Sequence, residues 1–280
     1  MEKIRNLSQL LNALEHGYRI PEKRNVKNTP YYAAHCTSKE ERHFCISLAG
    51  HIISIDTMNS ETYTLCKDYL CECEPDIYVS ISEDDIDFER QEAKKANTNQ
   101  RAAYLETLAV YRKICIALLN HDIFLMHGAV IAEGNNAYLF TAKSGTGKTT
   151  HIRKWLENLK NAYVVNGDKP LIKITKNNVL ACGTPWCGKE SMGMNCMTPL
   201  RSIILMERGD HNAIREISFG DAFTILLQQT YHPQESEQMM KTIRLLSHLN
   251  GRVKMYQYIF DNMKDDAFSV AYKALTEGKI

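Results

Sequence analysis

The glycine-rich run SGTGKTT, residues 144–150, constrains the fold of this chain more than any other feature. An apolar segment, 138–140, precedes it, and a segment with apolar residues at helical spacing, 152–159, follows it. A strand, a glycine-rich turn and a helix in that order form a phosphate-binding loop, because the turn aims backbone amides at an anion and the helix adds its dipole. In such a loop Lys148 reaches the outer phosphates and the Thr149 hydroxyl holds Mg²⁺.

The full pattern of this motif, Walker A, is G-x-x-x-x-G-K-[ST], and Ala142 stands where its first glycine belongs. The alternative interpretation is a glycine-rich loop that only turns the chain. The strand and helix on either side favour binding, because they are the context that the motif requires. The sequence therefore predicts a nucleoside triphosphate site formed by Ser144, Gly145, Thr146, Gly147, Lys148, Thr149 and Thr150.

A second candidate position follows the next apolar segment, 162–165, which ends at Asn166-Gly167-Asp168. An acidic residue at the carboxyl end of the strand after the loop helix is where such sites place a carboxylate that binds a metal or handles a proton. Asn-Gly-Asp is also good turn chemistry, so a plain turn is the alternative. The position along the chain favours a functional Asp168.

The segment Gly183–Glu190 combines glycines, a proline, a tryptophan and a Lys-Glu pair. This composition is typical of a mobile loop over a ligand, because glycines permit close approach and an exposed tryptophan supplies a flat apolar wall. We therefore expect Trp186, Lys189 and Glu190 to contact a substrate, with Lys189 nearest to an anionic group. A bland surface loop is the alternative.

Charge and composition limit the partners and the compartment. The 34 basic and 33 acidic residues leave a formal net charge of +1, so we expect neither nucleic-acid nor membrane binding. No signal-peptide pattern begins the chain, and no apolar run is long enough to span a bilayer. The nine cysteines include residues within apolar runs, such as Cys45 and Cys115, which is typical of reduced thiols. We expect a cytoplasmic protein.

Hydrophobic periodicity predicts two domains. Alternating strands at 44–48, 51–56 and 76–81 indicate a small strand-rich module over residues 1–95, and the acidic cluster at 83–89 is typical of a helix start. From residue 97 to 120 the spacing becomes helical, and the apolar run 123–131 predicts one strand. The rest of the predicted 96–280 domain has strands at 171–174, 179–182, 202–206 and 253–259, and helices near 219–231, 235–249 and 265–275.

His127-Gly128, the loop at 142–150, Asp168 and the segment Gly183-Thr184-Pro185-Trp186 together resemble the HPr kinase/phosphorylase group, over about residues 100–280. That group shares its nucleotide fold with ATP-dependent phosphoenolpyruvate carboxykinase. The resemblance implies an α/β phosphoenolpyruvate-carboxykinase-like P-loop domain with a small β-rich N-terminal module. It also implies ATP and Mg²⁺ as cofactors, with Thr149 and Asp168 on the metal. His127 would lie close to the transferred phosphate, although a buried histidine beside a strand is an equal alternative. Asp168 would match an acidic residue that is usually paired. Gly167 stands at the partner position.

We therefore expect an ATP-dependent kinase in which Lys148, Asp168 and His127 act on a hydroxyl acceptor. The acceptor is either a small molecule or a serine of a peptide or protein, and the oligomeric state is open. Phosphoryl transfer needs mainly positioning, charge neutralisation and one carboxylate to orient the attacking hydroxyl. The alternative is a nucleotide-binding regulatory module without phosphotransfer, which the lone carboxylate beside Gly167 favours.

Overall fold

A computed structural model describes residues 41–143, 145–261, 264 and 266–277 of the chain. Residues 37–280 form one compact unit. The first forty residues of the predicted N-terminal module lie outside the described residues, as does the loop residue Ser144. The domain boundary near residue 95 stays a prediction.

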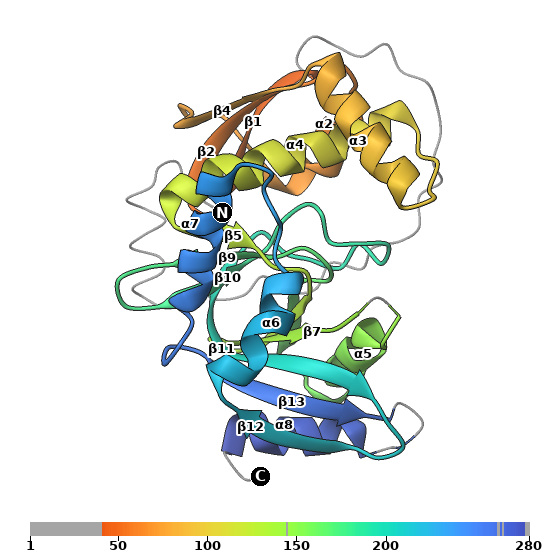
Figure 1. Ribbon diagram of the computed structural model, residues 1–280, viewed down its shortest axis with the longest axis vertical. Helices are drawn as coiled ribbons and strands as arrows, with labels where there is room; N and C mark the ends of the chain where they lie inside the picture. The colour runs from red at the N-terminus through yellow and green to blue at the C-terminus, as the bar shows by residue number, and fades with distance from the viewer. Residues whose placement is uncertain (1–40, 144, 262–263, 265, 278–280) are drawn as a thin grey trace. The chain divides into compact units, whose positions relative to one another are not determined.

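The first described part is a four-stranded sheet with helices packed along it (Figure 1). Its elements are β1 (His43–Leu48), β2 (His51–Asp56), α2 (Glu61–Leu65), a 3-10 turn (Lys67–Tyr69), β3 (Leu70–Cys71), β4 (Ile77–Ser80), α3 (Glu83–Lys95) and α4 (Ala102–Leu118). The strand order is β3-β1-β2-β4, and β1 and β2 form the predicted hairpin. Burial alternates along β1 and β4, as at Ile46 and Val79, whereas β2 buries three consecutive residues that include Ile53; the apolar ones share one core with α4. Period-2 patterning therefore predicted the buried face correctly.

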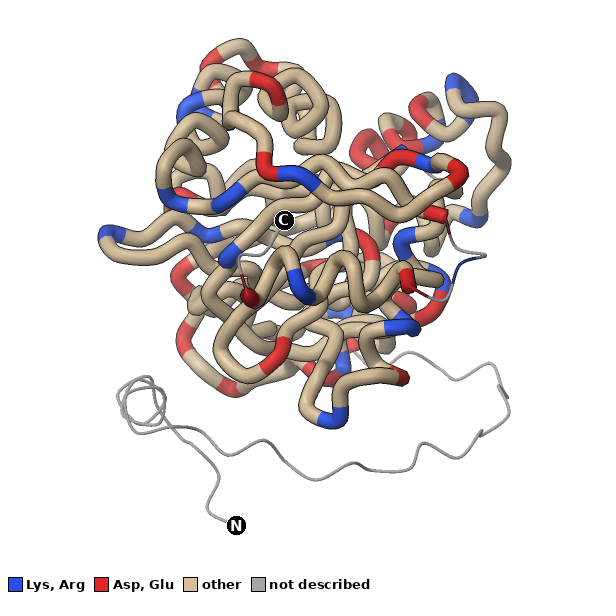
Figure 2. The backbone as a smooth tube through the Cα atoms, turned by 90° about the horizontal axis from the view of Figure 1, so that it is seen from below, with Lys and Arg blue, Asp and Glu red and all other residues tan. Residues whose placement is uncertain are grey.

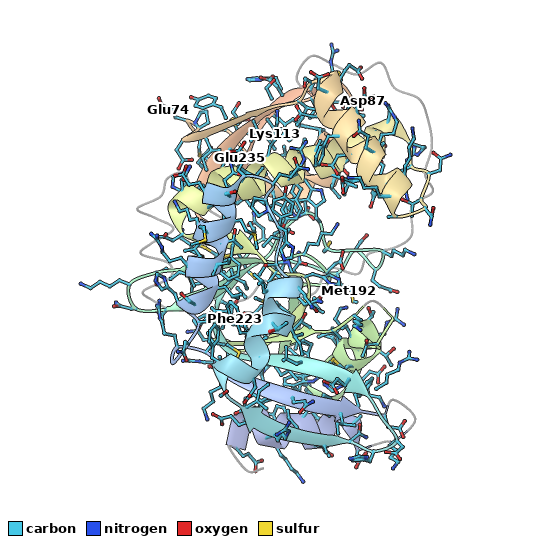
Figure 3. The ribbon with its side chains drawn as sticks, in the orientation of Figure 1. Glu74, Asp87, Lys113, Met192, Phe223 and Glu235 are labelled. Atoms are coloured by element: carbon cyan, nitrogen blue, oxygen red, sulfur yellow. The ribbon has the colours of Figure 1, made fainter. Side chains whose placement is uncertain are left out.

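The acidic cluster at 83–89 begins α3, as predicted. Ser82 and Asp85 form a capping box, in which the Ser82 N–H donates to Asp85 Oδ2 at 3.0 Å. Lys113 of α4, labelled in Figure 3, donates to Asp85 Oδ2 at 2.6 Å and to the Ser80 carbonyl at 2.8 Å. The Asp85 carboxylate thus places negative charge at the positive end of the α3 dipole, and its contact with Lys113 joins α3 to α4.

The second described part is built around a nine-stranded sheet. Its elements are a 3-10 turn (Leu119–His121), β5 (Ile123–Leu125), β6 (Ala129–Glu133), β7 (Asn136–Thr141), α5 (Lys148–Asn158), β8 (Ala162–Asn166), β9 (Leu171–Ile174), β10 (Val179–Cys182), β11 (Met197–Arg208), β12 (Ala213–Ile217), α6 (Phe219–Gln228), α7 (Ser236–Ser247), β13 (Lys254–Phe260) and α8 (Ala267–Glu277). The order β8-β6-β7-β11-β13-β12 forms the main surface, and β10, β9 and β5 continue from the first half of β11. The chain is therefore mixed α/β.

Both faces of this sheet are covered. Tyr138 and Phe140 of β7 pack with α5 and α8, whereas Leu139 between them faces the cluster of α6 and α7. A strand that is buried on both faces needs apolar residues at successive positions. This explains why the apolar residues of β7 and of the middle of β11 do not alternate with polar ones. Three layers result, and the sheet is the middle one (Figure 1).

The apolar run 123–131 is not one strand, contrary to prediction. It divides into β5, which pairs with β9, and β6, which pairs with β7. Gly128 lies in the break, where a Cβ would come within 2.9 Å of both Leu139 Cδ2 and the Phe140 carbonyl oxygen. Apolar content cannot reveal this break, because both halves are equally apolar and β5 pairs with β9, which lies far along the chain, whereas β6 pairs with the next strand.

Within the described residues, no helix is both long and apolar enough to span a membrane. Figure 2 shows basic and acidic residues interspersed along the described chain. The eight described cysteines are free.

Glu106 of α4 tests how the segment after β2 is attached to this helix. Its fully buried carboxylate accepts hydrogen bonds from the Met58 N–H at 2.5 Å, the Asn59 N–H at 3.0 Å and Asn59 Nδ2 at 2.9 Å. Glu106→Ala removes the acceptor of three donors and should lower the free energy of unfolding by about 2–4 kcal/mol. Urea unfolding measures the loss. Glu106→Gln should cost less, and exposed Glu157→Ala should stay within about 0.5 kcal/mol. An alanine variant as stable as the parent would contradict this role.

Candidate active site

One edge of the large sheet collects every candidate of the predicted catalytic set. β7, β11 and β13 are parallel, so their carboxyl ends share this edge. β6 runs antiparallel to β7 and β8 antiparallel to β6, which brings the start of β6 and the end of β8 to the same edge. Across it lie, in order, Asp168 after β8, His127 before β6, the loop after β7, Arg208 at the end of β11 and Phe260 at the end of β13.

The predicted strand, glycine-rich turn and helix are present as β7, residues 142–147 and α5. Gly145 and Gly147 have φ of +79° and +116°. A Cβ at Gly147 would also lie 2.8 Å from Phe260 Cε1, so this position requires glycine. Ala142 is buried in the core between the large sheet and helices α5 and α8. Its carbonyl accepts a hydrogen bond from Lys148 Nζ at 3.0 Å. Its methyl group is therefore accommodated where the motif has glycine.

Arg208 supports this loop from the neighbouring strand. Its Nη2 donates to the Gly145 carbonyl at 2.6 Å and its Nε to the Thr146 carbonyl at 3.2 Å. A small cavity of about 120 Å³ lies beside it, lined by Thr146, Arg208 and Phe260 among others. Sequence reasoning missed Arg208, because nothing near it in the chain indicates that the end of β11 adjoins the loop.

Backbone hydrogen bonds hold His127 beside the loop. The Thr141 hydroxyl donates to the His127 carbonyl at 2.7 Å, and the His127 N–H donates to the Gln229 carbonyl at 2.7 Å. The next residue, Gly128, donates its N–H to the Asp168 carbonyl at 2.9 Å. Three distant segments of the chain are thereby fixed around one imidazole.

The side chain of His127 lies between two oxygen atoms. Its Nδ1 is 2.9 Å from Gln229 Oε1, and its Nε2 is 3.2 Å from Asp168 Oδ1. A doubly protonated ring donates to both oxygens, whereas a neutral ring donates to one of them. Gln229, which the sequence did not single out, thus belongs to the same cluster.

Asp168 belongs to a turn and also lies at the site, so the two sequence interpretations are not exclusive. Asn166 Oδ1 accepts hydrogen bonds from the N–H groups of Asp168 and Lys169, at 2.8 and 2.7 Å. Asn166 is itself buried and donates through Nδ2 to the carbonyl and hydroxyl oxygens of Thr184. This Asx turn after β8 aims the Asp168 carboxylate at His127.

The local charges favour an ionised Asp168. Burial opposes ionisation, but the hydrogen bond from His127 and the charges of Lys169, His127 and Lys148 outweigh it and lower the pKa of the carboxyl. Burial also lowers the pKa of the Lys148 ammonium, against the opposing effect of Asp168. The half-buried Lys148 ammonium has the Ala142 carbonyl as its hydrogen-bond partner and forms no ion pair within the described residues. Such a cation is suited to an anionic ligand.

Gly167 is enclosed by the segment between β10 and β11. A Cβ there would lie 2.8 Å from the Cys187 carbonyl oxygen and 3.1 Å from that of Met192, a residue labelled in Figure 3. Gly188, with φ of +81°, comes as close to the Asp168 side chain, since its Cβ would be 2.9 Å from Asp168 Cβ. The packing of residues 187–192 over the turn thus leaves no room for a second carboxylate beside Asp168.

Trp186 is not an exposed wall over a ligand, and this prediction was wrong. Its side chain is buried, its ring stacks on Tyr111 at 4.2 Å between centroids, and its Nε1 donates to the Thr107 carbonyl at 3.0 Å. The indole therefore lies in the core that the four-stranded sheet shares with α4. A glycine- and proline-rich neighbourhood suggested exposure, whereas the apolar surface of α4 buries the ring.

Lys189 and Glu190 are exposed, and the structure brings neither into the His127–Asp168 cluster. Glu190 forms an ion pair with Arg153 of α5. This pair links the segment after β10 to the helix that follows the glycine-rich loop. Contact of Lys189 and Glu190 with a substrate stays a prediction. Thr149 is half-buried and Thr150 exposed at the start of α5, and Ser144 lies outside the described residues.

No protein-family model and no curated protein matches the sequence. Among solved structures, the chain is similar to the Hpr(Ser) kinase/phosphatase from Coxiella burnetii, with a TM-score of 0.34 and 10% identity. The match covers 55% of this chain and 97% of that one. These values are too low to transfer a family or an activity from one chain to the other.

The enclosure of Gly167 has a direct test. Gly167→Ala places a methyl group against two backbone carbonyls and should lower the free energy of unfolding by about 1–3 kcal/mol, measured by urea unfolding. Gly220→Ala is the matched control. Its Cβ meets nothing closer than the Ser218 hydroxyl oxygen at 3.6 Å, so it should be neutral or stabilise α6 by up to about 1 kcal/mol. Equal effects of the two substitutions would show that Gly167 is not enclosed.

Proposed function

We propose that this chain is an ATP-dependent phosphotransferase of the HPr-kinase-like, phosphoenolpyruvate-carboxykinase-related P-loop type, acting on a hydroxyl acceptor. The observation that carries the proposal is the meeting of Lys148, His127 and Asp168 at one sheet edge, from three separate segments of the chain. A loop that merely turned the chain would need neither a half-buried lysine that forms no ion pair with any described residue nor an ionised carboxylate facing a histidine.

The residues at this edge fit a magnesium nucleotide. Lys148 supplies an under-compensated cation for phosphate, and the Thr149 hydroxyl lies one residue into α5. The described residues contain no group of three or more metal-binding side chains. A Mg²⁺ ion suits this arrangement, because it usually keeps several waters and takes one or two protein oxygens plus phosphates. Thr149 and Asp168 are the oxygens we assign to it.

Phosphoryl transfer then divides between few groups. ATP with Mg²⁺ would supply the phosphoryl group and much of the charge neutralisation. Lys148 neutralises charge on the outer phosphates. Asp168, kept ionised, accepts a hydrogen bond from the attacking hydroxyl and takes its proton, while His127 orients the carboxylate and, when doubly protonated, adds positive charge. Gln229 holds the ring in place from the side away from Asp168.

Asp168→Asn tests the proton-handling role. ADP release should rise when a suitable hydroxyl acceptor is added to the parent protein, measured across a panel of small alcohols, hydroxy acids and serine peptides. The asparagine variant should lower that acceptor-dependent rate by about 10²-fold or more, because an amide cannot accept the proton. Asp56→Asn, an exposed aspartate at the end of β2, is the control and should keep the parent rate.

A regulatory module without phosphotransfer is the competing function, and the single carboxylate beside enclosed Gly167 favours it. That function predicts ATP binding with Mg²⁺, no acceptor that raises ADP release, and no effect of Asp168→Asn. This combination of results would exclude the kinase.

Thr149→Val tests the metal independently of turnover. Valine matches the shape of threonine without the hydroxyl, so nucleotide affinity in EDTA should equal that of the parent. The gain in affinity that Mg²⁺ brings to the parent should fall by roughly tenfold, the effect of about one charge-assisted contact. Isothermal titration calorimetry with a non-hydrolysable ATP analogue measures both. A variant with the full Mg²⁺ effect would remove Thr149 from the metal site.

A further inference from the structure

A second cavity of about 380 Å³ opens next to His127, and none of the described residues of the glycine-rich loop lines it. Its walls come from α3, α4, the end of β5 and the segment that follows α6. The loop cavity beside Arg208 and Phe260 belongs to β11 and β13, whereas this one belongs to the β6 and β8 side. A nucleotide on the loop would therefore leave this cavity for the second substrate. Its volume lies within the range of about 300–1,000 Å³ typical of small-molecule sites.

The charged side chains of the α3 and α4 walls are already paired. Arg112 Nε donates to Glu89 at 2.6 Å and its Nη2 to Asp85 at 3.2 Å, while the guanidinium lies 4.5 Å from the centre of the Phe88 ring. Glu92 pairs with Lys95 at 2.5 Å. These groups hold the wall together and leave little charge for a ligand.

Lys169 is the exception. It lines the cavity half-buried, and no carboxylate of the described residues forms an ion pair with its ammonium. Its backbone is firmly fixed: the N–H donates to Asn166 Oδ1 at 2.7 Å, and the carbonyl accepts from the Tyr111 hydroxyl at 2.6 Å and the Thr184 hydroxyl at 2.9 Å. These three hydrogen bonds fix the position from which the Lys169 side chain enters the cavity. The cavity thus contains an ammonium on a well-fixed backbone, and its charge acts on Asp168 and Glu89 although neither forms an ion pair with it among the described residues.

We propose that this cavity binds the phosphoryl acceptor and that the acceptor is a small hydroxy acid, whose carboxylate is held by Lys169 while its hydroxyl faces Asp168. The inference rests on the proposed kinase function. Asp168 directly precedes Lys169 in the chain, and His127, which also lines the cavity, lies 3.2 Å from the Asp168 carboxylate through its Nε2. The Lys169 ammonium matches a carboxylate with a single negative charge, and Leu108, Leu125 and Tyr231 offer apolar contact to its carbon skeleton.

The step balances without a further reactant. The acceptor oxygen forms a bond to the γ-phosphorus of ATP, the bond from that phosphorus to the β–γ bridging oxygen breaks, and ADP leaves. Asp168 takes the hydroxyl proton and releases it to solvent. The acceptor carboxylate takes no part in bond making, and Lys169 is a positioning residue.

The experiment compares each hydroxy acid with an analogue in which an uncharged group replaces the carboxylate. ADP release is measured with glycerate against glycerol, with L-serine against L-serinamide, and with an acetylated serine peptide amide. The parent should prefer the acid in each pair. Lys169→Met should raise KM for the acid by about 10- to 100-fold, the effect of one charge-assisted hydrogen bond, and bring the ratio of kcat/KM between acid and counterpart toward one. Lys169→Arg should keep much of the preference, and exposed Lys176→Met should keep all of it.

Direct binding makes the test independent of turnover. Saturation-transfer NMR with Mg²⁺ and a non-hydrolysable ATP analogue should detect the acid on the parent and lose its signal in Lys169→Met. Acceptor-dependent ADP release with equal use of acid and counterpart, with the peptide preferred, or with an unchanged ratio in Lys169→Met would overturn this inference and leave the kinase intact. No acceptor-dependent release at all, together with an inert Asp168→Asn, would overturn the kinase itself.

Discussion

Two hydrogen bonds to backbone carbonyls at the edge of the large sheet hold the site together. The Thr141 hydroxyl reaches the His127 carbonyl, and the Gly128 N–H reaches the Asp168 carbonyl. They join the end of β7, the start of β6 and the turn after β8, which carry the glycine-rich loop, the histidine and the carboxylate. Because strand pairing already aligns these ends, two short hydrogen bonds suffice to hold three functional groups within one small region.

The segment between β10 and β11 makes this arrangement specific. It packs Cys187 and Met192 against Gly167 and Gly188 against Asp168, so the turn after β8 carries one carboxylate. The same segment contains Trp186, whose indole is buried against α4. Burial of a large aromatic ring is among the stronger single contributions to a core, about 2–3 kcal/mol or more. The ring therefore anchors a segment that reaches the candidate catalytic carboxylate.

Helices α3 and α4 have a comparable double role. Their ion pairs among Asp85, Glu89, Arg112 and Lys113 join them to each other and to β4. The α4 face also contributes Tyr111, which stacks on Trp186 and fixes the backbone of Lys169. Helix α4, which shares a core with the first sheet, thus also fixes the backbone of Lys169 beside Asp168.

The sequence by itself determined the local structure: the hairpin β1–β2, the capping box of α3, and the strand, turn and helix around Lys148. Each depends on residues a few positions apart, through alternation, capping and the φ angles that glycine permits. It also predicted Asp168 and His127 as parts of a site around the loop, and the structure places both residues at the same sheet edge as the loop. Only the tertiary structure decided that Gly128 interrupts the apolar run 123–131, that Trp186 is buried, and that Arg208, Gln229 and Lys169 join the site. Those outcomes depend on strand pairing and packing between segments far apart in the chain, for which neighbouring residues carry no signal.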